Sequence, residues 1–227
     1  MCEPCGCGDH ELVSVELAQS IMRANAHQAQ HNRAHFCEAG VLAINVMGAP
    51  GAGKTALLEA TAAALPGCAL AAMSGDLATE NDAERLRAAG IASAPIITGS
   101  ACHLDAELVH HALHALPWQR ADVLFIENVG NLVCPAIYDL GQAANVVVLS
   151  VTEGVDKPLK YPTMFQAADL VVITKTDLLP YLPGVSLRAI EDSLARVMPE
   201  PRSMALSATT GQGLGGFVDW LSAQRSA

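Results

Sequence analysis

From residue 41 onward, short runs of apolar residues alternate with segments of helical pattern, and this alternation constrains the fold more than any other feature. Most of the runs are apolar at every position, which is typical of parallel strands buried on both faces. They predict strands at 41–47, 68–73, 95–98, 122–127, 145–151, 169–174 and 203–207. Helices are expected near 54–65, 79–89, 104–116, 186–197 and 214–224. This order predicts an α/β fold with a doubly wound, mostly parallel sheet and helices on both faces.

Two segments precede the alternating region. Residues 1–11 are small, polar and rich in cysteine, and we interpret them as a flexible tail. A helical pattern follows, with Ser14 as a suitable N-cap, and Gly40 ends it. The chain is therefore expected to contain a tail, an N-terminal helix and linker at 12–40, and a main domain at 41–227.

Composition limits the class of protein. The chain has 227 residues, 51% of them apolar, which suffices for one α/β domain with a buried core. Its apolar runs are too short to span a bilayer and residues 1–20 lack a signal-peptide pattern, so we expect a cytoplasmic protein without a membrane partner. Cysteines stay reduced there, and clustered ones indicate metal or redox chemistry. The net charge of -10 argues against a nucleic-acid partner.

The segment GAPGAGKT, residues 48–55, lies between the first predicted strand and the first predicted helix. It matches G-x-x-x-x-G-K-[ST] at every fixed position, which predicts a P-loop NTPase domain. Its glycines allow backbone N–H groups to turn toward one anion, Lys54 can reach the β- and γ-phosphates, and the Thr55 hydroxyl can bind Mg²⁺. The predicted nucleotide-binding residues here are Gly48, Gly51, Ala52, Gly53, Lys54, Thr55 and Ala56.

A second motif, TKTD at 174–177, follows an apolar strand and resembles the N-K-x-D motif of GTPases, with Thr174 in place of the usual Asn. The Asp177 carboxylate can accept two hydrogen bonds from guanine, for which adenine has no matching donors, while Lys175 packs along the base. A plain turn at the strand end is the alternative. SATTG resembles the Ser-Ala loop that supports the base in the same superfamily. The residues predicted to contact GTP or GDP are Thr174, Lys175, Asp177, Ser207 and Ala208.

Acidic residues follow two of the predicted strands. Asp76 and Glu127 are expected to face the Mg²⁺ ion or its waters beside the P-loop, although either could instead cap the next helix. Gly130 has the spacing of a glycine that senses the γ-phosphate. The predicted Mg²⁺ ligands are Thr55, Asp76 and Glu127, and the predicted catalytic residues are Lys54, Thr55, Asp76, Glu127 and Gly130.

Cysteine and histidine also occur together in the main domain. Cys102 and His103 are adjacent, and Cys134 follows Gly130 by four residues. Thiolate and imidazole together suit zinc or nickel, whereas ordinary buried thiols are the alternative. If Gly130 moves with the γ-phosphate, Cys134 should move with it, which would couple this metal site to the nucleotide.

The tail has its own cysteine cluster, Cys2, Cys5 and Cys7. Three thiolates at this spacing, with a backbone or terminal nitrogen, suit square-planar Ni²⁺, and binding itself would order the segment. Zinc with His10 as a fourth ligand and an unligated tail are the alternatives.

Other histidines recur at helical spacing. His27, His31 and His35 share one face of the N-terminal helix, and His110 and His114 share a face of a later one. Such a stripe can bind metal, but we expect these side chains to be solvated on the surface.

The chain resembles the HypB family in the order of its motifs, which are CEPCGC, GAPGAGKT, GDLATENDAERL, GSACHLDA, ENVGNLVCP, TEGVDKPLKYP and TKTDLLPY. HypB proteins are GTPases that help to insert nickel into nickel–iron hydrogenase. The resemblance implies a metal site at Cys102, His103 and Cys134 near a homodimer interface promoted by GTP, and a nickel motif in the tail. It also implies two partners, a HypA-like metallochaperone and the hydrogenase large subunit.

These observations predict a slow GTPase and metallochaperone that uses GTP or GDP, Mg²⁺, Ni²⁺ and Zn²⁺. A urease-maturation GTPase is one alternative, although that family lacks the CxxCGC tail and the GSACHLDA segment found here. A nickel or zinc storage protein with a weakly active GTPase domain is the other, and the intact Lys54, Thr55 and Asp177 argue against it.

Overall fold

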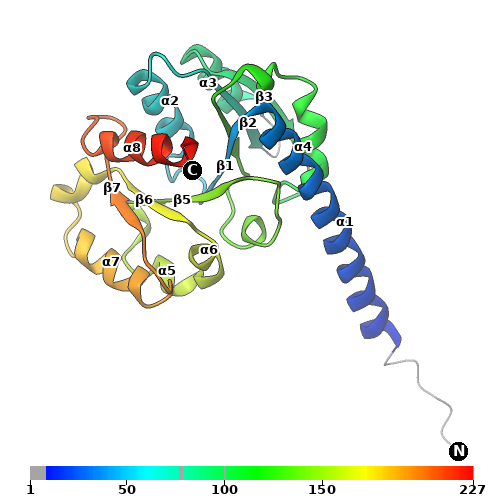
Figure 1. The fold of residues 1–227 in the computed structure, drawn as a ribbon. Coiled ribbons are helices and arrows are strands. Elements are labelled where there is room, and N and C mark those ends of the chain that lie inside the picture. The colour runs from blue at the N-terminus through cyan, green and yellow to red at the C-terminus, as the bar shows by residue number, and fades with distance from the viewer. Residues whose placement is uncertain (1–8, 77–78, 100, 227) are drawn as a thin grey trace, which may run out of the picture.

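A parallel sheet of seven strands forms the centre of the structure, with helices on both of its faces (Figure 1). The computed structural model describes residues 9–76, 79–99 and 101–226. The strand order is β3-β2-β4-β1-β5-β6-β7, and every neighbouring pair is parallel, as the sequence predicts. The strands are β1 (Leu42–Gly48), β2 (Leu70–Asp76), β3 (Ala92–Ile97), β4 (Val123–Glu127), β5 (Ala144–Ser150), β6 (Leu170–Thr174) and β7 (Ser203–Ala205).

The helices between these strands are mostly those that the sequence predicts. They are α1 (Asp9–Ala39), α2 (Lys54–Ala64), α3 (Asn81–Ala88), α4 (Ala106–Leu113), α5 (Lys157–Lys160), α6 (Pro162–Gln166), α7 (Leu187–Ala195) and α8 (Leu214–Arg225). The short helices α5 and α6 were not predicted, because elements of four and five residues are too short to show helical periodicity. Among the described residues, each helix is either too short or too polar to cross a membrane.

The sheet is buried on both faces near its centre. All seven residues of β1 are buried, and successive side chains point to opposite faces. Ile44 belongs to the hydrophobic cluster that contains Leu57 of α2, whereas Ala43 belongs to the cluster that contains Phe36 of α1 and Val109 of α4. This double burial explains why the strands are apolar at nearly every position.

Helix α1 is longer than the sequence pattern predicts. It begins at Asp9, so the prediction of Ser14 as its N-cap is wrong, and residues 9–11, assigned to the tail, are helical. The physical reason is that no glycine or proline interrupts residues 9–39, so nothing within this stretch of sequence breaks the helix. Its predicted end is confirmed, since α1 ends at Ala39 and Gly40 has a left-handed φ of 67°.

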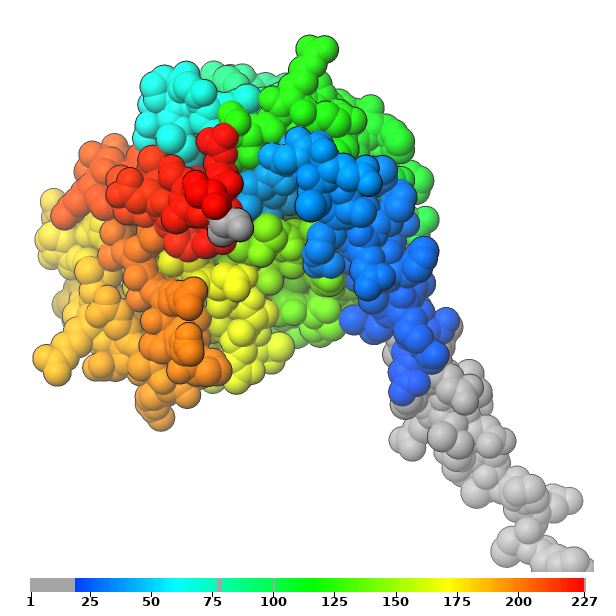
Figure 2. Space-filling view, in the orientation of Figure 1, coloured from blue at the N-terminus to red at the C-terminus, as the bar shows by residue number. Residues whose placement is uncertain are grey.

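The second half of α1 is part of the main domain. Asn32 is fully buried, and its amide nitrogen donates hydrogen bonds to the carbonyl oxygens of Ala106 (2.8 Å) and Leu140 (3.1 Å). The amide oxygen of Asn25 accepts a hydrogen bond from the backbone nitrogen of Ala106 (2.9 Å). These contacts hold α1 against the start of α4, and the second half of the helix lies on one flank of the body (Figure 2).

We predict that Asn32→Ala lowers the free energy of unfolding by about 1–3 kcal/mol, because it leaves two buried carbonyl oxygens without their donor. Urea unfolding followed by circular dichroism measures this change. Gln30→Ala is the matched control, because Gln30 is exposed on the same helix, and it should change the stability by less than about 0.5 kcal/mol. Equal stability of the two variants would contradict the docking of α1 through Asn32.

Candidate functional site

The P-loop connects β1 to α2 at the carboxyl edge of the sheet. Gly51 and Gly53 have φ angles of 73° and 98°, which L-residues with a side chain rarely adopt. Gly48 is required for a different reason, since a Cβ there would lie 2.4 Å from the carbonyl oxygen of Val148. A cavity of about 470 Å³ opens over the loop and is also lined by the ends of β2 and β4. In an open parallel sheet, this edge is where ligands bind.

Lys54, the first residue of α2, is buried in the P-loop. Its ammonium nitrogen lies 3.4 Å from the carbonyl oxygens of both Gly48 and Ala49, to which it donates. Burial lowers the pKa of Lys54, and the nearby carboxylate of Glu127 opposes this shift. The ammonium group is thus held in a poorly solvated position, where an anionic ligand would be strongly attracted to it.

Glu127, the last residue of β4, offers carboxylate oxygens that suit Mg²⁺. The Thr55 hydroxyl donates to its Oε1 atom (2.8 Å), while its Oε2 atom is buried and has no hydrogen-bond partner among the described residues. Burial raises the pKa of Glu127 to about 7, although Lys54 and the Thr55 hydroxyl act in the opposite direction. A hard cation would satisfy the unpaired oxygen, and oxygen ligands are those that Mg²⁺ prefers.

The helix-capping alternative is wrong for both acidic residues. The Glu127 carboxylate contacts Thr55, and Glu80, not Asp76, is the N-cap residue of α3. Asp76 ends β2, lines the cavity and accepts a hydrogen bond from the Thr79 hydroxyl (2.6 Å). Both carboxylates therefore lie at the edge of the sheet where the sequence predicts the Mg²⁺ site.

The TKTD motif is tied to the P-loop through its first two residues. The buried Thr174 hydroxyl donates to the carbonyl oxygen of Ala52 (2.6 Å), and the Lys175 ammonium group donates to that of Gly51 (2.7 Å). Lys175 has a left-handed φ of 59°, which is uncommon for a residue other than glycine. Thr174, which stands where GTPases have Asn, thus supports the loop instead of facing outward.

The other predicted base-contacting residues lie next to this motif. The backbone nitrogen of Thr176 donates to the carbonyl oxygen of Leu206 (3.3 Å), which joins the motif to the SATTG loop. Ser207 is buried and accepts a hydrogen bond from the Thr210 nitrogen (3.2 Å), so it shapes this loop. Asp177 is half-buried at the start of a short 3-10 helix, Thr176–Tyr181, and Ala208 is half-buried as well.

The segment after β4 is packed directly on the P-loop. A Cβ on Gly130 would lie 2.8 Å from Cγ and 2.9 Å from the backbone nitrogen of Pro50, so the contact requires glycine. The next residue, Asn131, forms an antiparallel bridge with Gly48. The Asn131 side chain donates to the carbonyl oxygen of Cys102 (3.2 Å) and accepts from the nitrogen of Val133 (2.9 Å). One residue therefore connects the nucleotide loop to both cysteine-bearing segments.

The structure brings Cys102, His103 and Cys134 together. The two sulfur atoms are 3.2 Å apart, and all three potential ligand atoms lie within 4.8 Å of one another. Cys102 is exposed and Cys134 half-buried, so the alternative of ordinary buried thiols is wrong. The Cys102 thiol raises the pKa of Cys134 and burial lowers that of His103, which stacks on Tyr138 at 4.0 Å. A bound divalent cation would favour thiolate formation at this site.

Two residues of the site were missed from the sequence. Arg85 lines the cavity and donates to both carboxylate oxygens of Glu59 (3.0 and 2.7 Å). Asn128 is buried and accepts a hydrogen bond from the nitrogen of Leu104 (3.2 Å), next to His103. The one indication of their role in the sequence is position, since each lies in a polar segment after a strand. The predicted ligands Cys2, Cys5 and Cys7 lie outside the described residues.

Together, the sheet, the P-loop and the cavity define a P-loop nucleotide-binding protein. The family model "CobW/HypB/UreG, nucleotide-binding domain" matches residues 42–204. The chain is 47% identical over 217 residues to the hydrogenase maturation factor HypB of Rhizobium leguminosarum bv. viciae, covering 95% of this chain and 72% of that protein. It therefore belongs to the CobW/HypB/UreG family, and within it to the HypB hydrogenase maturation GTPases.

Two solved HypB structures have the same fold. The structure of HypB from Helicobacter pylori in complex with nickel has a TM-score of 0.85 and 37% identity, covering 89% of this chain and 95% of that one. HypB from Archaeoglobus fulgidus has a TM-score of 0.82 and 38% identity, covering 89% of this chain and 99% of that one. These similarities agree with the parallel sheet and the P-loop described above.

The pKa of Glu127 predicts a pH dependence of stability when Mg²⁺ and nucleotide are removed. Between pH 4.5 and about 7, folded Glu127 holds a proton that the unfolded chain has released, so its contribution to stability is lost as the pH rises through this window. We expect the free energy of unfolding of the parent, relative to Glu127→Gln, to fall by about 1–2 kcal/mol between pH 5.5 and 7.5.

Urea unfolding in EDTA at a series of pH values measures this difference. Glu84→Gln is the matched control, because Glu84 is exposed on α3, and its pH profile should follow that of the parent. Parallel profiles for the parent and Glu127→Gln would show that Glu127 does not titrate in this range.

Proposed function

We propose that this GTPase couples its nucleotide state to the binding of nickel, or zinc, by Cys102, His103 and Cys134 during hydrogenase maturation. The observation that carries the proposal is the path through Asn131, which contacts the P-loop at Gly48 and both cysteine-bearing segments. Nickel is favoured over other ions because a related HypB structure contains it and because thiolates and imidazole suit it.

The proposed coupling between the γ-phosphate and the metal ligands acts through direct steric contact along a few residues. Gly130 is in van der Waals contact with Pro50 of the P-loop, so a γ-phosphate that engages the Gly130 N–H group has to shift this segment or fix it. Cys134 lies on the same segment, and Asn131 also holds the carbonyl group of Cys102. A change at the phosphate end therefore alters the distances among the metal ligands.

Nucleotide binding and hydrolysis are assigned to the residues at the carboxyl edge of the sheet. Lys54 binds the phosphates, and Thr55, Asp76 and Glu127 would hold Mg²⁺, which neutralises phosphate charge when it is bound. Asp177 reads guanine, because its carboxylate accepts from two donors that adenine lacks. Lys175 packs along the base, and the loop at Ser207 and Ala208 supports it.

The remaining assignments rest on the sequence and on the HypB family. Cys2, Cys5 and Cys7 are proposed to bind Ni²⁺, with zinc as the competing ion. GTP is proposed to promote a homodimer, and a HypA-like metallochaperone and the hydrogenase large subunit are the proposed partners. A cytoplasmic location suits all of these roles, because the thiol ligands have to stay reduced. GTP turnover at a steady rate would distinguish this function from that of a storage protein.

Metal affinity should depend on the bound nucleotide. In the full chain with Cys2, Cys5 and Cys7 replaced by Ala, we expect the Ni²⁺ affinity with GDP and with a non-hydrolysable GTP analogue to differ by about 5–150-fold, the usual range for coupled sites. Asn131→Ala should reduce this ratio toward one, because it removes the side chain that connects the two loops. Calorimetric titration in each nucleotide state measures it.

The matched control for this experiment is Val133→Ala, because Val133 lies on the same segment with an exposed side chain. It should retain the coupling of the parent. Equal Ni²⁺ affinity of the parent in both nucleotide states would contradict the proposed coupling even if the three ligands are correct.

Base selectivity should depend on Asp177. We expect Asp177→Asn to weaken GTP binding by ~3 kcal/mol, or about 100-fold, because two charge-assisted hydrogen bonds are lost. The same variant should bind XTP better than the parent does, since xanthine has a carbonyl acceptor where guanine has an amino donor. Competition binding against a fluorescent GDP measures both effects. A parent that binds ATP and GTP equally would show that Asp177 does not read the base.

A further inference from the structure

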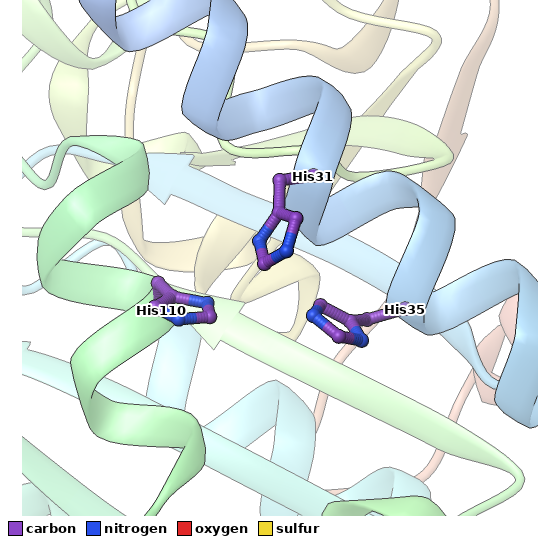
Figure 3. A group of neighbouring side chains, drawn as sticks. All are labelled: His31, His35 and His110. Atoms are coloured by element: carbon purple, nitrogen blue, oxygen red, sulfur yellow. The ribbon is translucent and has the colours of Figure 1, made fainter.

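Three histidines from two helices meet on the flank of the domain that α1 covers. His31 and His35 lie one turn apart on α1, and His110 lies on α4 (Figure 3). Each offers one ring nitrogen, and these three atoms lie within 4.8 Å of one another. The ring centroids are separated by 4.4 Å for His31 and His35 and by 5.1 Å for His31 and His110. The sequence predicts surface placement for these histidines, and His31 is exposed, but it does not predict that the two helices bring the three rings together.

We propose that His31, His35 and His110 form a further metal site, which binds a divalent first-row transition ion such as Ni²⁺ or Zn²⁺ through three imidazoles. Two histidines at i and i+4 on one helix are a recurrent metal-binding pair, and a third from a neighbouring helix completes a facial set. With bonds of about 2.0–2.1 Å, the ligand nitrogens of a tetrahedral site lie about 3.3 Å apart. The observed nitrogens, which lie within 4.8 Å of one another, would have to move closer by side-chain rotation to reach this separation.

The chemistry around His110 favours a cation at this position. Its Nδ1 atom is buried and has no hydrogen-bond partner among the residues that the structure describes. An unpaired buried polar atom of this kind destabilises the fold, and a bound cation would satisfy it. Burial and, to a smaller extent, the neighbouring imidazoles lower the pKa of His110, a shift toward the neutral ring that binds metals.

The surroundings of the cluster also suit a metal ion. The Gln28 amide nitrogen lies 3.4 Å from Nδ1 of His31, so this side chain packs beside the ring. A cavity of about 270 Å³, whose lining includes His35, His110 and His114, adjoins the cluster. It provides space for a water molecule in the fourth coordination position and a route by which the ion can exchange.

The two helices are held in place without the metal. Asn25 and Asn32 bind the first turn of α4 from α1, so the cluster is pre-organised and does not depend on the ion to assemble. A bound ion would nevertheless strengthen the contact between α1 and α4. The proposal does not depend on the coupling of nucleotide and metal, since none of its residues lines the nucleotide cavity.

The test uses the full chain in which the other proposed metal ligands, Cys2, Cys5, Cys7, Cys102 and Cys134, are replaced by serine. Calorimetric titration with NiCl₂ or ZnCl₂ should show one ion per chain, and nitrogen NMR should show shifts of the imidazole signals of His31, His35 and His110. His31→Ala and His110→Ala should each weaken binding at least about tenfold, since even the loss of an outer partner weakens metal binding by 10–100-fold.

The matched controls are His27→Ala on α1 and His111→Ala on α4, because both side chains are exposed and outside the cluster. They should bind the ion with the same affinity as the protein that carries only the five serine replacements, which we call the serine background. His31 is exposed, so its variant should fold even if His110→Ala does not, and unchanged GTP turnover confirms folding. Failure of the background to bind either ion, or equal affinity of His31→Ala and His27→Ala, would overturn the proposal.

Discussion

At the end of β1 the chain passes so close to β5 that a methyl group on Gly48 would lie 2.4 Å from the carbonyl oxygen of Val148. This approach places the P-loop backbone where the other parts of the site can contact it. Lys175 and Thr174 donate to two of its carbonyl oxygens, and Gly130 packs against its proline. The segments proposed for base recognition, for phosphate sensing and for metal binding therefore all adjoin this one loop.

The connection between the nucleotide cavity and the cysteine pair needs few residues. Asn131 bridges to the P-loop through its backbone and holds the cysteine-bearing segments through its side chain. Asn128 gives a second connection, because its buried side chain bonds both to Asn45 in β1 and to the backbone next to His103. Both routes consist of directional hydrogen bonds between packed segments, which is the kind of connection that the proposed coupling of nucleotide and metal requires.

Much of the fold and of the candidate site could be predicted from local patterns. The strands were predicted because burial on both faces makes them apolar throughout, and the P-loop because its glycine spacing is a requirement of the backbone. The predicted start of α1 at Ser14 was wrong, because a capping residue does not stop a helix when the residues directly before it, here 9–13, contain no glycine or proline. Arg85 was missed, because a single basic residue on a short helix has no pattern that marks it as part of a site.

The sequence by itself determined the class of protein and the nucleotide loop, since both are encoded by residues close together in the chain. It predicted Cys102, His103 and Cys134 as a metal site through the family resemblance, and the structure brings Cys134 next to Cys102 across 32 residues of chain. Only the tertiary structure decided that His31 and His35 meet His110. That meeting depends on Asn32 docking α1 against α4, and the periodicity of either helix alone is equally compatible with a solvated surface. Local patterns report which face a side chain occupies, whereas the partner of that face is set by long-range packing.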